Sequence, residues 1–313
     1  MTQGSESEGF VELPGGSRIF YRRSGKGEPI LLLHGIAHSS QAWDRVIPAL
    51  TSRYEVIALD LPGCGRSDKP DTDYSLGTQA AAVRYVLDRL HLDLVTAIGH
   101  SLGGGVAMTL AYQYPERVGR LGLVASAGLG RDLHLLFRAA TLPFAPERAM
   151  RVLFHPRMRV PRNLLGLIMS QALGDPFFHR PKQHRREFEA LLQGLEEPGA
   201  QRAFLATLRS ASNYAGQSVS ALDRIGLAEF PVLIVWGKDD RVFPVAHAWR
   251  AHQELPHARV VVIEHCGHFP QLEATQQFIK ALRRWLDETR PLRIYPVQSG
   301  PPTGRDVPGA SVA

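Results

Sequence analysis

The chain contains few cysteines and no long apolar run. Its 313 residues include two cysteines, Cys64 and Cys266, which lie far apart and do not make a disulfide framework. This usage is typical of a reducing cytoplasm, the compartment that we expect. No cysteine or histidine cluster has zinc-ligand spacing, so we expect no metal, and no feature of the sequence calls for a cofactor. No apolar run reaches the roughly 18 residues of a membrane-spanning helix, and the polar, acidic start lacks the features of a secretory signal.

The charge surplus is small and confined to one segment. Lys and Arg number 36 and Asp and Glu 30, which gives a net charge of +6 at pH 7. Residues 131–224 contain 14 basic and eight acidic residues, and this difference accounts for the whole surplus. Nucleic-acid binding is not expected, because basic and acidic residues are equal in number in the rest of the chain and no nucleic-acid-binding motif is present. We interpret the basic segment as a solvated helical face; the alternatives are attraction of an anionic substrate or of an acidic membrane surface.

Short apolar runs that end near glycine predict a mostly parallel sheet. We expect a hairpin over 10–13 and 18–23, then buried strands over 29–33, 54–59, 94–98, 121–125, 231–236 and 258–264. Helices are predicted over 78–90, 102–114, 245–255 and 273–288. This alternation is typical of an α/β fold in which crossovers join the strands.

The alternation of predicted strands and helices is interrupted between about residues 129 and 225. This stretch is rich in proline, has no convincing strand, and has apolar runs of helical spacing over 164–173 and 188–195. Because it is too long for a loop, we predict a helical insertion at 129–225, with a core formed by 1–128 and 226–290. The proline- and glycine-rich tail at 291–313 is expected to be disordered.

Residues 99–103, GHSLG, match the pattern G-x-S-x-G between a predicted strand and a predicted helix. In a nucleophile elbow, this sharp turn exposes the serine hydroxyl, and small neighbours let strand and helix pack closely. A serine nucleophile needs a base that is itself oriented by an acid. Asp240 and His268 follow the last two predicted strands, so with Ser101 they would gather at the carboxyl edge of the sheet.

Together these features resemble the α/β-hydrolase fold family, in its capped branch of esterases and proline-iminopeptidase-like enzymes. The resemblance covers about residues 10–290 and rests on four motifs: His34-Gly35 with Trp43 eight residues after the glycine, DLPGCGRS at 60–67, GHSLG at 99–103, and GKDD at 237–240 followed by Gly267-His268. It implies a mostly parallel central sheet flanked by helices, with the insertion as a helical cap. These motifs are specific for the fold and much less so for the substrate.

The resemblance also implies roles for individual residues. Ser101 would be the nucleophile, His268 the general base and Asp240 the acid that orients it. The backbone amides of Ile36 and Leu102 would form the oxyanion hole. No metal, nucleotide or flavin is implied.

Residues next to this predicted triad offer alternatives. The family pattern favours Asp240 over Asp239, which we interpret as a solvated loop carboxylate. His265 lies too close to the end of its strand to be preferred over His268 as the base. Cys266 would lack elbow geometry as a nucleophile.

Four side chains are candidate substrate contacts: His34, His38, His100 and Phe269. The resemblance equally allows His34 to support its loop. His38 could be a solvated loop residue, and His100 could simply pack.

The sequence therefore predicts a serine hydrolase that cleaves a carboxylic ester through an acyl-enzyme. Ser101 argues against haloalkane dehalogenases and epoxide hydrolases, which have aspartate at this position. Carbon–carbon hydrolases of ring-cleavage pathways commonly have asparagine before the serine, and His100 weakens that alternative without removing it. Hydrolysis of a vinylogous diketone or of an amide stays open, and so, more distantly, does a non-catalytic ligand receptor. The expected partner is a small anionic or acyl substrate, without nucleic acid or integral membrane association.

Overall fold

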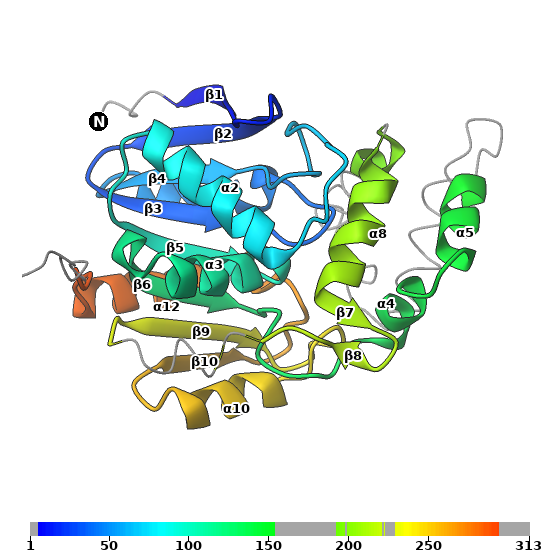
Figure 1. Ribbon diagram of the computed structural model, residues 1–313. Helices are drawn as coiled ribbons and strands as arrows, with labels where there is room; N and C mark the ends of the chain where they lie inside the picture. Colours follow the sequence, from blue (N-terminus) through cyan, green and yellow to red (C-terminus); the bar gives the residue numbers. More distant parts are fainter. Residues whose placement is uncertain (1–5, 154–191, 198, 221, 223–228, 294–313) are drawn as a thin grey trace, which may run out of the picture.

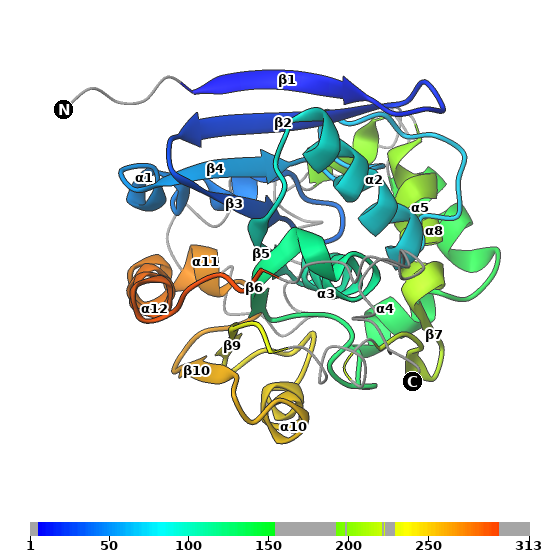
Figure 2. The same cartoon turned by 60° about the vertical axis from the view of Figure 1, so that its left-hand side comes forward.

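A computed structural model of the chain describes residues 6–153, 192–197, 199–220, 222 and 229–293. An eight-stranded sheet runs through the molecule (Figures 1 and 2) in the order β1-β2-β4-β3-β5-β6-β9-β10. The strands are β1 (Ser7–Glu12), β2 (Arg18–Gly25), β3 (Glu28–Leu33), β4 (Tyr54–Leu59), β5 (Val95–His100), β6 (Val118–Val124), β9 (Val232–Gly237) and β10 (Arg259–Ile263). Within this sheet β2 is antiparallel to β1 and β4 and the other neighbouring strands are parallel, so the predicted hairpin and the mostly parallel sheet are both confirmed.

Helices cover both faces of the sheet and bury two apolar clusters. One cluster lies under α2 (Leu76–Arg89), α3 (Leu102–Gln113) and α10 (Ala246–Glu254). The other lies under α1 (Ile47–Leu50) and α12 (Thr275–Glu288), with the short α11 (Pro270–Glu273) just before α12. Every residue of the central β5 and β6 is buried, which explains why most of their side chains are apolar.

The observed helices follow the predicted spacing, with shifts at their ends. The hydroxyl of Ser75 accepts a hydrogen bond from the Thr78 amide, so α2 begins two residues before the predicted start. The predicted helix over 273–288 is divided, because Ala274 has a non-helical backbone between α11 and α12. The apolar face of α12 repeats at helical spacing through its buried residues Phe278, Ile279, Leu282, Trp285 and Leu286.

Strand β6 begins three residues before its predicted start, because the apolar pattern used for the prediction is interrupted by the buried Arg120. The Arg120 guanidinium donates to Glu28 Oε2 (3.1 Å), Thr96 Oγ1 (3.1 Å) and the carbonyl oxygen of Thr289 (2.9 Å). These three acceptors stabilise the positive charge of Arg120 inside a strand whose other residues are apolar or glycine.

Disorder was predicted from residue 291, and this is wrong for the first residues of the tail. The Leu292 amide donates to the carbonyl oxygen of Gly119 in β6 (3.0 Å), and the Leu292 side chain packs on the core. Residues 294–313 lie outside the described part of the chain.

Helices α4 (Leu135–Ala140), α5 (Ala145–Leu153) and α8 (Ala200–Ala211) lie beyond the carboxyl ends of the parallel strands (Figure 1). The expectation that this segment has no strand is wrong, because β7 (Ser212–Asn213) pairs with β8 (Gly216–Gln217). Asn213 Oδ1 accepts from the Ala215 amide and tightens the turn between them. The run over 164–173 and residues 188–191 lie outside the described residues, while 192–196 are helical as expected. No described helix is both long and apolar enough to cross a membrane.

Replacing Trp285 by alanine should lower the free energy of unfolding by about 3–5 kcal/mol, because a cavity would replace a large buried side chain. Trp285 is 1% exposed, whereas Trp249 on α10 is 50% exposed. The Trp249→Ala control should change stability by less than about 0.5 kcal/mol. Urea unfolding would measure both variants, and equal losses would contradict this account of the core.

Candidate active site

Ser101 occupies a strained turn between β5 and α3. Its backbone angles are φ 52° and ψ −117°, a conformation that residues with a side chain rarely adopt. The turn needs glycine on both sides: a Cβ on Gly99 would lie 2.1 Å from the Gly103 carbonyl oxygen, and one on Gly103 would lie 2.4 Å from the Leu33 carbonyl oxygen. The GHSLG segment therefore forms the sharp strand-to-helix turn that its sequence predicts.

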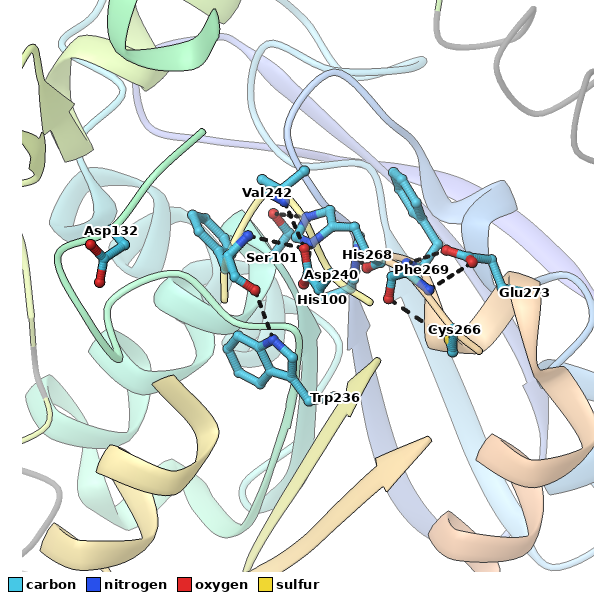
Figure 3. Close-up of polar contacts among 12 residues, drawn as sticks. His100, Ser101, Asp132, Trp236, Asp240, Val242, Cys266, His268, Phe269 and Glu273 are labelled. Carbon is cyan, nitrogen blue, oxygen red and sulfur yellow. Dashed lines mark hydrogen bonds and ion pairs between the residues drawn. The ribbon is translucent and has the colours of Figure 1, made fainter. Parts of the chain in front are cut away.

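Three buried side chains from separate loops form a hydrogen-bonded chain (Figure 3). His268 Nε2 lies 3.0 Å from Ser101 Oγ, and His268 Nδ1 lies 2.9 Å from Asp240 Oδ2. With the imidazole proton on Nδ1, the ring donates to the carboxylate and accepts from the serine hydroxyl. This arrangement can remove a proton from Ser101 and hold the resulting positive charge beside Asp240.

The loop after β9 brings Asp240, and not Asp239, to His268. Asp240 Oδ1 accepts from the amides of Val242 (2.8 Å) and Phe243 (3.0 Å), which leaves Oδ2 for the imidazole. Asp239 is exposed, as is His265 in the following loop. The structure thus places Asp240 beside His268 and leaves Asp239 and His265 at the surface.

Two backbone amides near Ser101 have no hydrogen-bond partner within the described ranges. They belong to Ile36, in the turn after β3, and to Leu102, the first residue of α3. An amide at the first position of a helix has no acceptor inside the helix, so that of Leu102 can bind an anion. Both predicted oxyanion-hole donors are thus available in the structure.

His34 supports the loop rather than offering a polar contact to substrate. Its Nδ1–H donates to the carbonyl oxygen of Gly35 (2.7 Å), and its Nε2 accepts from the Leu61 amide (2.9 Å). No ring nitrogen is left over, so His34 is removed from the candidate polar contacts. Burial lowers the pKa of this imidazole and keeps it neutral.

His100 and Phe269 pack against the catalytic candidate His268, and His38 lies beside Phe269. His100 Nε2 donates to the His268 carbonyl oxygen (2.8 Å), and its ring lies 5.0 Å from the rings of both His268 and Phe269. The ring of His38 lies 6.3 Å from that of Phe269, and its Nδ1 accepts from the Ser39 amide. Burial lowers the pKa of His38 to about 4 and holds that of His100 well below its usual value.

Glu273 is a site residue that sequence reasoning missed. Its two carboxylate oxygens accept from the amides of Gly267 (2.8 Å) and Phe269 (2.9 Å), the residues on either side of His268 (Figure 3). The carboxylate therefore holds the backbone that presents the imidazole. In the sequence, the only sign that Glu273 could belong to the site was its position five residues after His268. Spacing alone does not show which way a loop turns.

An aromatic ring also supports His268 from the acid loop. The ring of Phe243 meets His268 edge-on at 5.3 Å, and the Phe243 carbonyl oxygen accepts from Trp236 Nε1 (3.0 Å).

Within the described residues, no group of three or more His, Cys, Asp or Glu side chains is placed to hold a metal ion. The site as described consists of protein groups suited to nucleophilic and acid–base chemistry.

The sequence profile of the alpha/beta hydrolase family matches residues 30–281. The chain belongs to this family. An uncharacterized protein of Mycobacterium tuberculosis is 41% identical to this hydrolase over 277 residues, which cover 88% of this chain and 80% of the relative. A 2-hydroxy-6-oxo-6-phenylhexa-2,4-dienoate hydrolase of Comamonas testosteroni is 29% identical over 83% of this chain and 88% of its own. The crystal structure of a serine hydrolase involved in carbazole degradation superposes with a TM-score of 0.71 at 26% identity, over 90% of this chain and 99% of its own.

Replacing Glu273 by glutamine should slow covalent labelling of Ser101 in this α/β hydrolase by about 10- to 100-fold, because the amide NH₂ would face a backbone N–H and shift His268. The measurement is the rate of reaction with a fluorophosphonate. Glu264→Gln is the matched control, because Glu264 is exposed in the same loop and pairs with Lys238. Labelling of Glu273→Gln at the wild-type rate would show that Glu273 does not position the base.

The hydrolase should lose stability as the pH falls from 7 to 5. A histidine whose folded pKa is below 6.5 binds its proton more readily in the unfolded chain, so acid favours unfolding once the pH drops below 6.5. A folded pKa of about 4 for His38 corresponds to about 2 kcal/mol between these two pH values.

Urea unfolding of His38→Asn at both pH values tests this contribution. The asparagine oxygen can still accept from the Ser39 amide, and the variant should lose about 2 kcal/mol less than wild type on acidification. Asparagine at the exposed His257 serves as the control. An identical pH dependence in wild type and His38→Asn would contradict the prediction.

Proposed function

We propose that this α/β hydrolase cleaves a carboxylic ester by nucleophilic catalysis at Ser101. The observation that carries the proposal is the hydrogen-bonded chain from Ser101 through His268 to Asp240. The available amides of Ile36 and Leu102 support it, because the tetrahedral intermediate of acyl transfer needs two donors for its oxyanion.

In the proposed reaction, Ser101 Oγ attacks the ester carbonyl while His268 Nε2 takes the hydroxyl proton. Asp240 stabilises the imidazolium, and its own carboxylate is held by two backbone amides. The intermediate collapses as His268 returns the proton to the leaving alcohol, which leaves an acyl-enzyme. Water then attacks the acyl carbonyl with His268 again as the base, and the carboxylic acid and the free serine are regenerated.

We also propose that the insertion at 129–225 acts as a cap over this site. Two contacts support it. The His134 amide, at the start of α4, donates to the carbonyl oxygen of Val242, two residues after Asp240. In the second contact, Ala203 of α8 packs so closely on Gly63 that a Cβ on this glycine would lie 2.7 Å from the alanine methyl. The cap would line the substrate pocket and select a small acyl or anionic substrate.

A second candidate is hydrolysis of a carbon–carbon bond in a vinylogous diketone. The specific observation in its favour is the relative from Comamonas testosteroni, whose name gives 2-hydroxy-6-oxo-6-phenylhexa-2,4-dienoate as its substrate. The same nucleophile and base would serve this reaction. His100, where such enzymes commonly have asparagine, makes it the second choice.

Hydrolysis of a series of p-nitrophenyl esters, from acetate to palmitate, tests the ester proposal. Ser101→Ala should abolish turnover, and Asp240→Asn should lower kcat by about 10³- to 10⁴-fold because the imidazole loses its orienting anion. Asp239→Asn is the matched control and should retain wild-type activity.

Other outcomes separate the alternatives. Turnover of the dienoate without turnover of any ester would replace the first proposal by the second. If neither class reacts and a fluorophosphonate fails to label Ser101, the serine-hydrolase proposal fails and a ligand receptor becomes the better explanation.

A further inference from the structure

Exposed apolar side chains are concentrated in one segment of the chain, which comprises α4, the turn that follows it and α5. We call this surface the apolar tip and define it by five residues: Leu135, Leu136, Leu142, Phe144 and Val152. Phe144 is 75% exposed and Leu135 62%. Such a concentration differs from the single exposed apolar residues that are normal on a soluble surface.

The turn between the two helices displays three successive apolar residues, at 142–144, all of them exposed. Phe144 has φ 69°, which is strained for a bulky side chain, while its ring points to solvent. In a turn that only connects helices, a glycine would avoid the backbone strain, and a glycine or a polar residue would avoid the exposed apolar ring. The strained backbone together with the exposed ring indicates a functional role for Phe144.

The apolar tip is held from behind by α8. The Arg209 guanidinium donates to the carbonyl oxygens of Thr141 (3.2 Å) and Leu142 (2.6 Å) and pairs with Glu147 (2.5 Å). Figure 1 shows α8 between the sheet and α5, which is the outermost labelled helix on that side. The tip is therefore anchored on its inner side and presented outward.

Positive charge flanks the apolar tip. Arg148 and Arg151 are exposed one turn apart on α5, on the same face as Val152. Neither has an ion-pair partner in the part of the chain that the structure describes, and the nearby Glu147 is already neutralised by Arg209. The occupant of this surface should therefore be both apolar and anionic.

We propose that the apolar tip docks on an anionic lipid surface. Leu142 and Phe144 would enter the boundary between headgroups and acyl chains, while the two arginines meet the lipid phosphates. A second copy of this chain is a less suitable occupant, because it would bring the same unpaired arginines against each other. The proposal does not depend on the reaction catalysed at Ser101.

Co-sedimentation of the full chain with vesicles tests the proposal. Wild type should bind vesicles of phosphatidylcholine mixed with phosphatidylglycerol more tightly than vesicles of phosphatidylcholine alone. Phe144→Ser should lower the partition coefficient about ten-fold by removing the most exposed apolar group. Arg148→Gln and Arg151→Gln should each lower it about five-fold on the anionic vesicles only.

Helix α10 offers matched controls. Trp249→Ser and Arg250→Gln change an exposed aromatic residue and an exposed arginine outside the tip and should leave binding unchanged. The midpoint of urea unfolding should be nearly equal in all variants, which verifies the fold by a measurement that does not involve Ser101 and separates this test from that of the proposed function.

Three results would overturn the proposal: no binding of wild type to anionic vesicles, equal binding by wild type and Phe144→Ser, or losses in the α10 controls as large as those in the tip variants. Sedimentation velocity without lipid provides a further check. A dimer that dissociates in Phe144→Ser would instead assign the apolar tip to contact between copies of the chain.

Discussion

The close approach of β5 and α3 at Ser101 is the constraint on which the site depends. The serine sits at a positive φ angle, and its neighbours Gly99 and Gly103 leave no room for a Cβ against the facing backbone. This turn places Oγ beyond the carboxyl end of β5. Because β3, β9 and β10 run parallel to the strands between them, their following loops reach the same edge of the sheet. The base, the acid and the candidate oxyanion donors arrive there from separate parts of the sequence.

Burial then determines the electrostatics around that turn. The imidazoles of His34, His38 and His100 all have a lowered pKa, because a charged ring would lose its hydration there. Neutral neighbours do not compete with His268 for the Asp240 carboxylate. Backbone amides satisfy the other oxygen of Asp240 and both oxygens of Glu273. The loops thus use main-chain donors to hold carboxylates, which leaves a single imidazole free to exchange a proton with serine.

The parts of the fold that the sequence predicted well are those with strong local signals. Buried strands such as β3 and β4 read as short apolar runs, and helix α12 repeats its apolar residues at helical spacing. The start of β6 was missed because Arg120 is charged and its three acceptors come from distant segments. The β7–β8 pair was missed because two residues per strand are too few to show alternation. The docking of Leu292 on β6 depends on a contact 173 residues away in sequence, between Leu292 and Gly119, and leaves no local pattern.

By itself the sequence determined the fold family, the order Ser101, Asp240, His268 and the elbow around the serine, because each has a local pattern tied to a strand end. Tertiary structure decided the features that depend on the direction in which a side chain points. It turned His34 toward backbone partners, directed His100 Nε2 to the His268 carbonyl oxygen and placed Glu273 under the His268 loop. Spacing along the sequence does not show which way a loop side chain points. Only the path of the backbone determines which side chains face the site.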